Sequence, residues 1–599
     1  MKRSHWLGDW LDSRTGYKKL LHETLDEPVV GGARWAYVYG SALTLVFVVQ
    51  AVTGLLLMTT YAPSAQTAWA SVHYISYSLS GGWLIRGLHH FGSQAMVVLA
   101  ALHLGQVALF GAYKKPREMN WWFGLALLGI TLGFSLTGYL LPWDQQGYWA
   151  TRVATNIAGT MPVAGAFVQS LLQGGHQYGS LTLTRFYSAH VGLFPAALVL
   201  LLVAHIGLFR KHGVTPAARA DLTKVDAFYP KQVLYDLIAG LAVLAILFVL
   251  TLREHGAPLD APADPASDYP ARPEWYFLSL FQLLKYFDGP LEVVGTLVIP
   301  GLAATFLFAL PFLDRAPTTA LRGRFAYVAP IFVGFAALAG LTFLSTSGDA
   351  RDPAFQVARK KADARAAIAV NLAKAGVPPS GPLDMLKNDP EIRGEDLFAK
   401  NCAGCHVLGD LGSKDKAAAP TLDGWGTSAW VLAMIHDPDG AARFGKTPYK
   451  GEMPSVDTPP KDNKPETPFK PMARTDMEAV AAFLSSQEPS APTSGDDVAR
   501  KKGESIVSDR CTGCHMYKGD GDLVSSEKAP ELSGYGSIAW VKAQVTNPAT
   551  AATYRSKAVD DAALKGHMPR FDGELAASDI DLLARFVVSR ARGTPLLVP

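Results

Sequence analysis

The sequence predicts an all-α protein in which a transmembrane bundle of seven helices is followed by two small α-helical domains. The chain has 599 residues, of which 49% are hydrophobic and only 18% are charged. The hydrophobic residues concentrate in residues 37–345, where several runs reach the roughly 20 residues that cross a bilayer core. This composition excludes disordered, collagen-like and disulfide-scaffold chains. The net charge of +3 is too small to indicate nucleic-acid binding.

Seven spans are expected, at about 37–60, 86–110, 121–141, 186–209, 232–252, 293–313 and 325–345. The polar amino-terminal segment, residues 1–36, lacks the apolar core of a signal peptide and is expected in the cytoplasm. Up to residue 324, the cytoplasmic loops then hold seventeen Lys and Arg residues against five on the other side, as the positive-inside rule requires. An odd number of spans places everything after residue 345 outside the cytoplasm.

The chain divides further at changes of composition. Residues 37–228 hold the first four spans, residues 229–345 the last three, and residues 346–388 form a polar linker helix that ends in a Pro/Gly break. Residues 389–491 and 492–599 are internal repeats: APTLDGWGTSAWV returns as APELSGYGSIAWV. Cys402 and Cys511 are 109 residues apart, and Trp430 and Trp540 are 110 apart. So regular a period indicates duplication of one small fold.

Each repeat contains one C-x-x-C-H motif, formed by Cys402, Cys405 and His406 in the first repeat and by Cys511, Cys514 and His515 in the second. Two thiols at this spacing can form thioethers to one haem, and the following histidine then ligates the iron. The alternatives are a zinc knuckle and a redox C-x-x-C. The motifs use all four cysteines of the chain, so zinc would lack ligands and no structural disulfide is possible.

An electron-transfer haem of this kind needs a sixth ligand, and methionine raises its potential. Met453 and Met568 each precede a proline and lie 47 and 53 residues after the motif histidine. We therefore expect His406 and Met453 to ligate the iron of haem c 1, and His515 and Met568 to ligate that of haem c 2. Met472, before the last helix of the first repeat, is an alternative to Met453.

Four of the five histidines inside predicted spans form two spaced pairs: His89 and His103 on the second span, 14 residues apart, and His190 and His205 on the fourth, 15 apart. Fourteen residues make about 21 Å of helix and nearly four whole turns, so both histidines of a pair face one side. A single membrane histidine is often a packing residue, but ionisable residues in spans are usually functional. Because the two spans run in the same direction, we expect an outer haem b iron between His89 and His190 and an inner one between His103 and His205.

Two glycine pairs on the first and third spans repeat the 14-residue spacing: Gly40, Gly54, Gly124 and Gly138. Glycine lets a flat cofactor approach a helix backbone, although it also serves helix packing in membranes. Arg86 and Arg185 lie just outside the outer histidines. They are expected to pair haem propionates, with snorkelling at a helix end as the alternative.

The long outer loop between the fifth and sixth spans contains the sequence PEWY, Pro273 to Tyr276. Glu274 begins an apolar stretch there. A carboxylate against an apolar wall can accept a proton near neutral pH.

Together these residues resemble the cytochrome b of the cytochrome bc and bf complexes, the quinol-to-cytochrome c oxidoreductases. The resemblance covers about residues 30–345 and includes GYLLPWDQQGYWA (138–150) and LTRFYSAH (183–190). The seven spans and the 15-residue spacing place the chain nearer the chloroplast-type bf branch. Gly40 stands where that branch has a cysteine that tethers an extra haem, so no third membrane haem is expected. The tail is similar to class I cytochrome c domains, here fused in tandem.

The resemblance implies two non-covalent b haems, two covalent c haems and a quinone substrate. Quinol would be oxidised at the outer side near PEWY, where Glu274 would accept a proton and Tyr276 would position the ring. FYPKQVLYD (228–236) resembles the bc branch, which implies an inner quinone site that uses Asp236. Arg210 is expected to supply protons or pair propionates at the inner site, and the alternative is that it serves only the positive-inside signal. One electron would pass through a Rieske iron–sulfur protein to the c haems, and the other would cross the membrane through the b haems.

The partners follow from the same resemblance. All four cysteines are used, so the Rieske protein must be a separate subunit, and the acceptor would be a soluble cytochrome c or a terminal oxidase. The resemblance implies a homodimer in a bacterial cytoplasmic membrane, with the c-type domains on the periplasmic side and a contribution to proton translocation. A non-bifurcating quinol dehydrogenase, which sends both electrons through its fused c haems, is the alternative. A haem-handling or sensing protein would leave PEWY and the paired glycines unexplained.

Overall fold

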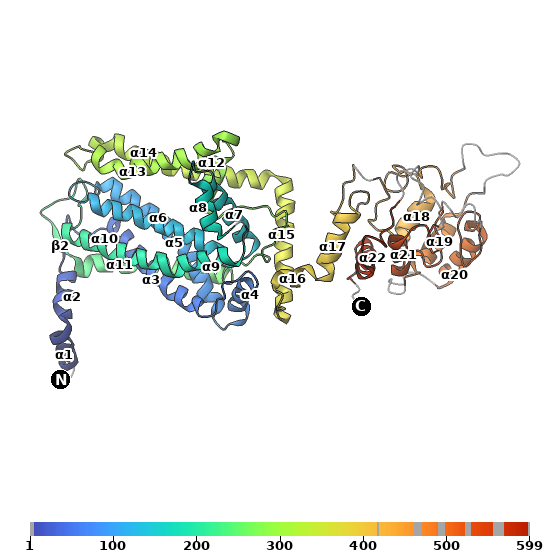
Figure 1. The fold of residues 1–599 in the computed structure, drawn as a ribbon, viewed down its shortest axis with the longest axis horizontal. Helices are drawn as coiled ribbons and strands as arrows, with labels where there is room; N and C mark the ends of the chain where they lie inside the picture. The colour runs from blue at the N-terminus through green and yellow to red at the C-terminus, as the bar shows by residue number, and fades with distance from the viewer. Residues whose placement is uncertain are drawn as a thin grey trace. The chain divides into compact units, whose positions relative to one another are not determined.

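The computed structural model of the chain describes residues 5–175, 177–415, 418–447, 449–459, 470–488, 497–521, 529–550, 552–554 and 568–596. The chain forms two compact units, residues 1–386 and 387–599, each described here by itself. Nearly all the regular structure is helical (Figure 1), which confirms the predicted all-α class.

Among the described residues of the first unit, seven helical segments are long and apolar enough to cross a membrane, the number that the sequence predicts. They are Trp35–Met58, Gly82–Phe110, Glu118–Leu140, Ser180–His212, Phe228–Arg253, Gly289–Leu313 and Leu321–Arg351. The second begins four residues before its predicted start, and the seventh continues six residues past its predicted end. Hydropathy therefore locates each span but does not fix the ends of its helix.

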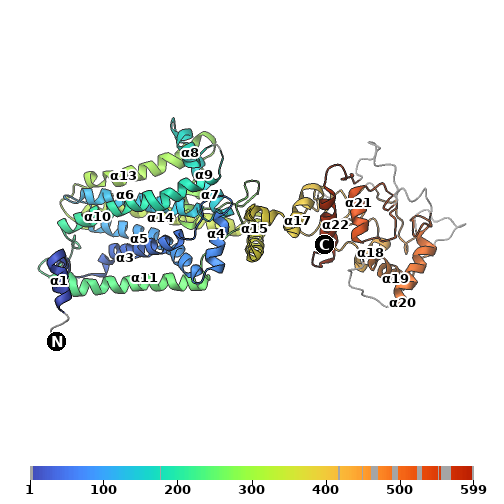
Figure 2. The same cartoon turned by 60° about the horizontal axis from the view of Figure 1, so that its bottom comes forward.

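The helices within these segments are α3 Val38–Met58, α5 Gly82–Phe110, α6 Glu118–Leu140, α9 Ser180–Ser188, α10 Phe194–His212, α11 Val233–Arg253, α13 Ile299–Leu313 and α14 Leu321–Arg351. Helix α3 packs along α5, α11 packs on both, and α6 packs along α10. They lie side by side as one bundle (Figure 2). Apolar side chains such as Ala42, Val46 and Leu99 fill the contact between α3 and α5.

Short elements connect the spans. They are the helices α1 His5–Thr15, α2 Tyr17–Leu25, α4 Ala68–His73, α7 Gln145–Gly159, α8 Gly165–Gln173 and α12 Leu278–Leu284, the 3₁₀ turns η1 Trp35–Tyr37, η5 Trp275–Phe277 and η6 Gly289–Leu291, and the π-helical turns η2 Tyr74–Ser78, η3 Ala189–Leu193, η4 Phe228–Gln232 and η7 Val294–Val298. Strands β1 Pro28–Val30 and β2 Val225–Ala227 pair antiparallel, with Pro28 opposite Ala227. This pairing ties the amino-terminal segment to the loop after the fourth span.

The segment expected to be a linker contains the helices α15 Pro353–Leu372 and α16 Pro382–Lys387 and the short turn η8 Ala373–Ala375. The Asp352 carboxylate caps α15 by accepting from two backbone N–H groups. His73 Nε2 lies 3.0 Å from the Val370 carbonyl oxygen, and Arg359 donates to the Tyr269 hydroxyl at 3.1 Å. Helix α15 is therefore anchored on α4 and on the loop that contains Tyr269, both in the first unit.

The second unit contains α17 Pro390–Asn401, α18 Ser428–His436, α19 Arg474–Ser485, α20 Asp497–Ile506, the π-helical turn η9 Val507–Cys511, α21 Ile538–Thr546 and α22 Ala577–Arg592. The sequence repeat extends to the helix caps. The Thr427 side chain accepts from the Trp430 N–H at the start of α18, and the Ser537 side chain accepts from the Trp540 N–H at the start of α21. Equivalent residues therefore begin equivalent helices.

Candidate functional site

The four membrane histidines form two facing pairs. The ring centres of His89 and His190 are 6.3 Å apart, and those of His103 and His205 are 6.4 Å apart, with the rings steeply inclined to each other. A metal–imidazole bond of about 2 Å, with the metal centred between two ring nitrogens, leaves ring centres about 6 Å apart. Each pair therefore has the separation that an iron ion between two histidines requires.

The 15-residue spacing of His190 and His205 is compensated inside the helix. His190 lies in the π-helical turn η3, Ala189–Leu193, between α9 and α10. Such a turn takes one residue more than an α-helical turn. The extra residue is absorbed there, so both histidines face α5, whose own pair is 14 residues apart.

Neighbouring oxygens orient three of these rings. His89 Nδ1 lies 2.9 Å from the Thr53 hydroxyl, His190 Nδ1 lies 3.1 Å from the Thr137 hydroxyl, and His205 Nδ1 lies 3.0 Å from the Asn120 carbonyl oxygen. A hydrogen bond at Nδ1 leaves Nε2 available for a metal and fixes the direction of the ring. Both threonines immediately precede a glycine of the spaced pairs.

Each spaced glycine lies against one of the four histidines. A methyl group on Gly138 would come within 2.6 Å of His190 Cε1, and one on Gly54 within 3.2 Å of His89 Cε1. The corresponding distances are 3.4 Å from Gly124 to His205 and 3.6 Å from Gly40 to His103. The glycines thus leave room beside the rings, which is what a large flat group held by these histidines needs.

The two arginines expected near haem propionates have protein partners in the first unit. Arg86 donates to the carbonyl oxygens of Ala257 at 2.7 Å and Pro258 at 2.5 Å. Arg185 donates to the carbonyl oxygen of Leu171. The first contact fixes the loop after α11 to α5, and the second fixes α8 to α9.

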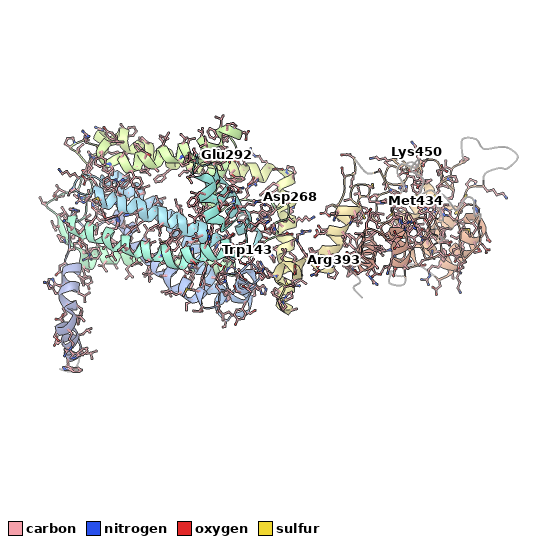
Figure 3. The ribbon with its side chains drawn as sticks, in the orientation of Figure 1. Trp143, Asp268, Glu292, Arg393, Met434 and Lys450 are labelled. Atoms are coloured by element: carbon pink, nitrogen blue, oxygen red, sulfur yellow. The ribbon has the colours of Figure 1, made fainter. Side chains whose placement is uncertain are left out.

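The PEWY segment begins the turn η5, Trp275–Phe277. Trp275 Nε1 donates to Gln94 on α5 at 3.3 Å, and Tyr276 forms a side-chain hydrogen bond with Ser135 on α6. The segment is thus fixed to the two helices that carry the outer histidine His89 and the outer glycine Gly138. Figure 3 labels Trp143, which lies between α6 and α7, and Asp268, which lies in the connection between α11 and η5.

Glu274 has a buried acidic neighbour. Burial raises the pKa of the Glu274 carboxyl, and the nearby Asp144 carboxylate raises it further. Burial together with the Asp260 carboxylate raises the pKa of Asp144 to about 6. A carboxyl group in such surroundings exchanges a proton closer to neutral pH than a free one does.

At the opposite end of the bundle, Asp236 on α11 accepts from Gln232 Nε2 at 2.9 Å. The Gln232 side-chain oxygen in turn accepts from the Arg34 backbone N–H at 2.9 Å. Arg210 Nη1 lies 4.0 Å from a carboxylate oxygen of Glu27. The structure therefore gives Asp236 and Arg210 separate partners.

In the second unit, both motif histidines have the same support. His406 Nδ1 lies 2.9 Å from the Pro420 carbonyl oxygen, and His515 Nδ1 lies 2.8 Å from the Pro530 carbonyl oxygen. Nε2 of each ring is thus left for a metal. The exposed Cys405 and Cys514 and their more buried partners Cys402 and Cys511 are free thiols, as haem attachment requires.

The methionines are distributed differently from the expected pairing within each repeat. Met568 packs against the core that contains Cys402, whereas Met453 packs against the core that borders Cys511. Met472 is buried in this second core.

Sequence reasoning missed the threonines at His89 and His190. The repeated Thr-Gly pairs at residues 53–54 and 137–138 were a signal for them. It also missed Asp144 and Asp260, whose proximity arises from a loop contact between distant segments: Gln145 N donates to the Ala261 carbonyl oxygen at 2.8 Å.

Comparison with known proteins finds three family models along the chain. Residues 94–262 match the family described as Cytochrome b(N-terminal)/b6/petB, and residues 262–360 match Cytochrome b(C-terminal)/b6/petD. Residues 392–488 and 500–591 each match Cytochrome c. The first match begins after His89, so the pairing of His89 with His190 depends on the distance between their rings.

Relatives and a solved structure agree with these models. Cytochrome b6 of Mastigocladus laminosus is 37% identical over 207 residues, 35% of this chain and 96% of the relative, and that of Synechococcus sp. (strain RCC307) is 36% identical over 215 residues, 36% and 99%. A cytochrome bc complex cytochrome b subunit of Chlorobaculum thiosulfatiphilum is 35% identical over 285 residues, 47% of this chain and 66% of the relative. A structure titled "Hyperthermophilic respiratory Complex III" has 28% identity and a TM-score of 0.52, over 59% of this chain and 93% of that one.

Proposed function

This chain belongs to the cytochrome b/b6 family and carries two cytochrome c domains behind its membrane helices, and from that premise we propose that it is the membrane subunit of a quinol:cytochrome c oxidoreductase. The observation that carries the proposal is the pair of facing histidine couples in the bundle, each with its own glycine gap. Electron transfer across a membrane needs carriers on both sides of the bilayer, and two sites about 21 Å apart along a helix supply that arrangement.

We assign two b haems and two c haems to the chain. His89 with His190 would hold the outer b haem and His103 with His205 the inner one. The two C-x-x-C-H motifs would bind the c haems covalently. When bound, these groups supply one-electron transfer, and axial methionine on the c haems would give them the higher potentials.

The outer quinol site is assigned to the PEWY segment. Glu274 would accept a proton from quinol, because its raised pKa makes its carboxylate a better proton acceptor than an exposed carboxylate. Tyr276, held by Ser135, would position the ring. The apolar residues that follow favour binding of a lipid-like substrate at this depth.

A row of polar groups supports release of the proton to the outer side. Beyond Glu274, the Asp144 carboxylate accepts from the Asp260 backbone N–H at 3.3 Å, and the Asp260 carboxylate accepts from the Tyr269 hydroxyl at 2.5 Å. Tyr269 in turn accepts from Arg359 on α15, whose side chain is 39% exposed. The row therefore leads from a buried carboxyl group to the surface.

The inner quinone site is assigned to Asp236, with Arg210 on the same side of the membrane. Asp236 is half-buried and its carboxylate is oriented by Gln232. A positioned carboxyl group there can deliver a proton from the cytoplasmic side to a reduced quinone.

We propose that the complex includes a Rieske iron–sulfur protein, a second copy of this chain, and a soluble cytochrome c or terminal oxidase as acceptor. It would lie in a bacterial cytoplasmic membrane with the c domains on the periplasmic side. The orientation is supported by the excess of Lys and Arg on the side of residues 1–36. With quinol oxidised outside and quinone reduced inside, turnover would contribute to proton translocation.

Electron paramagnetic resonance of the purified, quinol-reduced complex tests this proposal. A [2Fe–2S] signal of Rieske type beside the haem signals is the expected result. An active preparation without that signal would support the second candidate, a linear quinol dehydrogenase that passes both electrons to the fused c haems.

A further inference from the structure

We propose that the two cytochrome c repeats exchange halves, so that each c haem is bound by both: His406 shares its haem with Met568, and His515 shares its haem with Met453. The inference rests on the proposed attachment of a haem at each C-x-x-C-H motif. It replaces the expected pairing within each repeat.

The first observation is which helices pack together. The amino-terminal helix of the first repeat, α17, packs on the carboxy-terminal helix of the second, α22, and α20 of the second repeat packs on α19 of the first. Both views show α17 beside α22 and α20 beside α19 (Figures 1 and 2). Each amino-terminal helix thus finds its carboxy-terminal partner in the other repeat.

Both contacts are close and use equivalent residues. A methyl group on Gly394 of α17 would come within 2.8 Å of the Phe586 side chain on α22. A methyl group on Gly503 of α20 would come within 2.0 Å of the Ala479 carbonyl oxygen and 2.8 Å of Phe483 Cβ on α19. Gly394 and Gly503 are 109 residues apart, the same separation as Cys402 and Cys511. The same helix crossing is therefore formed twice, each time between repeats.

Ion pairs mark the same exchange. Arg393 on α17 (labelled in Figure 3) lies 2.6 Å from Asp579 on α22, and Lys502 on α20 lies 2.6 Å from Asp476 on α19. Arg393 and Lys502 are equivalent in the repeat, and so are Asp476 and Asp579, each the third residue of its helix. Such partly exposed pairs add little stability, but they fix which helices are neighbours.

The buried cores place the methionines. One core joins Phe398 and Cys402 of the first repeat to residues of α21 and α22, and Met568 packs against it. Gln544 on α21 contacts the Met568 sulfur at 3.5 Å. A haem attached at Cys402 therefore lies in the core that Met568 borders.

The second core mirrors the first. It joins Val507, Tyr517 and Leu532 of the second repeat to residues of α18 and α19, and both Met453 and Cys511 pack against it. A haem attached at Cys511 therefore lies in the core that Met453 borders.

The crossing point is two glycine turns. Gly426 and Gly536 have φ of +77° and +83°, and a methyl group on Gly536 would lie 3.7 Å from Gly426 Cα. The preceding aromatic rings, Trp425 and Tyr535, have centres 5.5 Å apart. Arg592 at the end of α22 donates to the Gly536 carbonyl oxygen at 3.0 Å. The part of each repeat before its turn, which includes the haem-binding motif, packs in one of the two cores. The part after the turn, which includes the methionine, packs in the other core. Exchange of identical elements needs only such a hinge.

Variants of the full chain that keep a single c haem test the ligand assignment. The double substitution Cys402→Ser and Cys405→Ser leaves the haem at His515 as the one c haem beside the two b haems, and its ferric iron–methionine bond has its own absorption band. In that background we expect Met453→Ala to abolish the band and Met568→Ala to keep it. In the reciprocal background, Cys511→Ser with Cys514→Ser, the effects of the two methionine substitutions should be reversed. Loss of the band with the methionine of the same repeat, with both methionines or with neither overturns the proposal.

Zero-length carbodiimide cross-linking of the unmodified complex, read by mass spectrometry, decides the question even where those variants do not assemble. The expected product joins Lys502 to Asp476. The ion pair of Lys542 with Asp581, 2.8 Å apart within the second repeat, is the internal control. A Lys502–Asp579 product, or the control product without Lys502–Asp476, overturns the exchange. A chain without c haem that still gives the Lys502–Asp476 product would refute the proposed haem attachment and leave the helix exchange standing.

Discussion

Gly138 on α6 and His190 in the turn η3 touch so closely that a single methyl group on the glycine would come within 2.6 Å of the imidazole Cε1. Of the four glycine–histidine contacts in the bundle, this one leaves the least room. The small residue is therefore a condition for His190 to point at His89 across 6.3 Å.

Gly138→Ala is accordingly expected to displace the His190 ring and to lower the content of b haem toward one per chain. Gly129→Ala is the matched control, because Gly129 is on the same helix and a methyl group there would meet nothing within 4 Å. The b-haem absorption per unit of protein measures both. Equal haem content in the two variants would contradict the proposed role of Gly138.

Thr137 tests the orientation of the same ring. Its hydroxyl donates to the Gly133 carbonyl oxygen at 2.8 Å, so its oxygen is available to accept from His190 Nδ1–H at 3.1 Å. Thr137→Val removes this acceptor and makes the imidazole a weaker donor to iron. A lost hydrogen bond of about 1 kcal/mol corresponds to roughly 40 mV for one electron, so the outer b haem should rise in potential by about that amount. Redox titration checks this, and the inner b haem should stay unchanged.

Glu274→Gln should lower quinol oxidation about a hundredfold, the usual loss when a general base is removed. Because the carboxyl accepts a proton only when ionised, the wild-type rate should rise with pH through the raised pKa of Glu274. The variant should lack that rise. Glu292→Gln, at an exposed position near the start of the sixth span (Figure 3), is the control. A variant that keeps both rate and pH profile would remove Glu274 from the reaction.

Asp144 makes a prediction about stability. Its pKa is raised to about 6 by burial and by Asp260, so its contribution to stability is complete below its ordinary pKa and is lost as pH rises through 6. Asp144→Asn keeps an oxygen to accept from the Gly147 N–H and cannot ionise. The variant should therefore gain stability relative to wild type as pH rises from about 4 to about 6, by at most about 3 kcal/mol, and keep that gain at higher pH.

Thermal unfolding of the purified protein at several pH values measures this difference. Asp268→Asn, at an exposed position of the loop that holds Asp260, should show no such trend. A gain that is constant with pH would mean that the pKa of Asp144 is the same in the folded and the unfolded protein, and would contradict the prediction.

The membrane bundle was predictable from sequence because its signals are local or periodic. Hydropathy finds the seven spans, and the 14-residue spacing places His89 and His103 on one face of α5. The 15-residue spacing on the fourth span departs from that period, and only the structure shows that the turn Ala189–Leu193 absorbs the extra residue.

Contacts between distant segments could not be predicted in this way. Lys114 and Arg324 were counted as cytoplasmic loop cations, but both bind Asp314, and the Arg324 side chain is fully buried. The methionines show the same limit, since a repeat in sequence does not say which copy of a helix meets which. The pairing of α17 with α22 depends on contacts across almost the whole tail.

In the proposed reaction, one quinol sends its two electrons along separate routes. The most direct measurement is the redox state of the b haems, followed by absorption, when the c haems of the quinol-equilibrated complex are suddenly oxidised. We predict that the b haems become more reduced at that moment, because oxidation of the c haems draws one electron outward and forces the other into the bundle. Oxidation of the b haems together with the c haems would contradict the account and identify a linear quinol dehydrogenase.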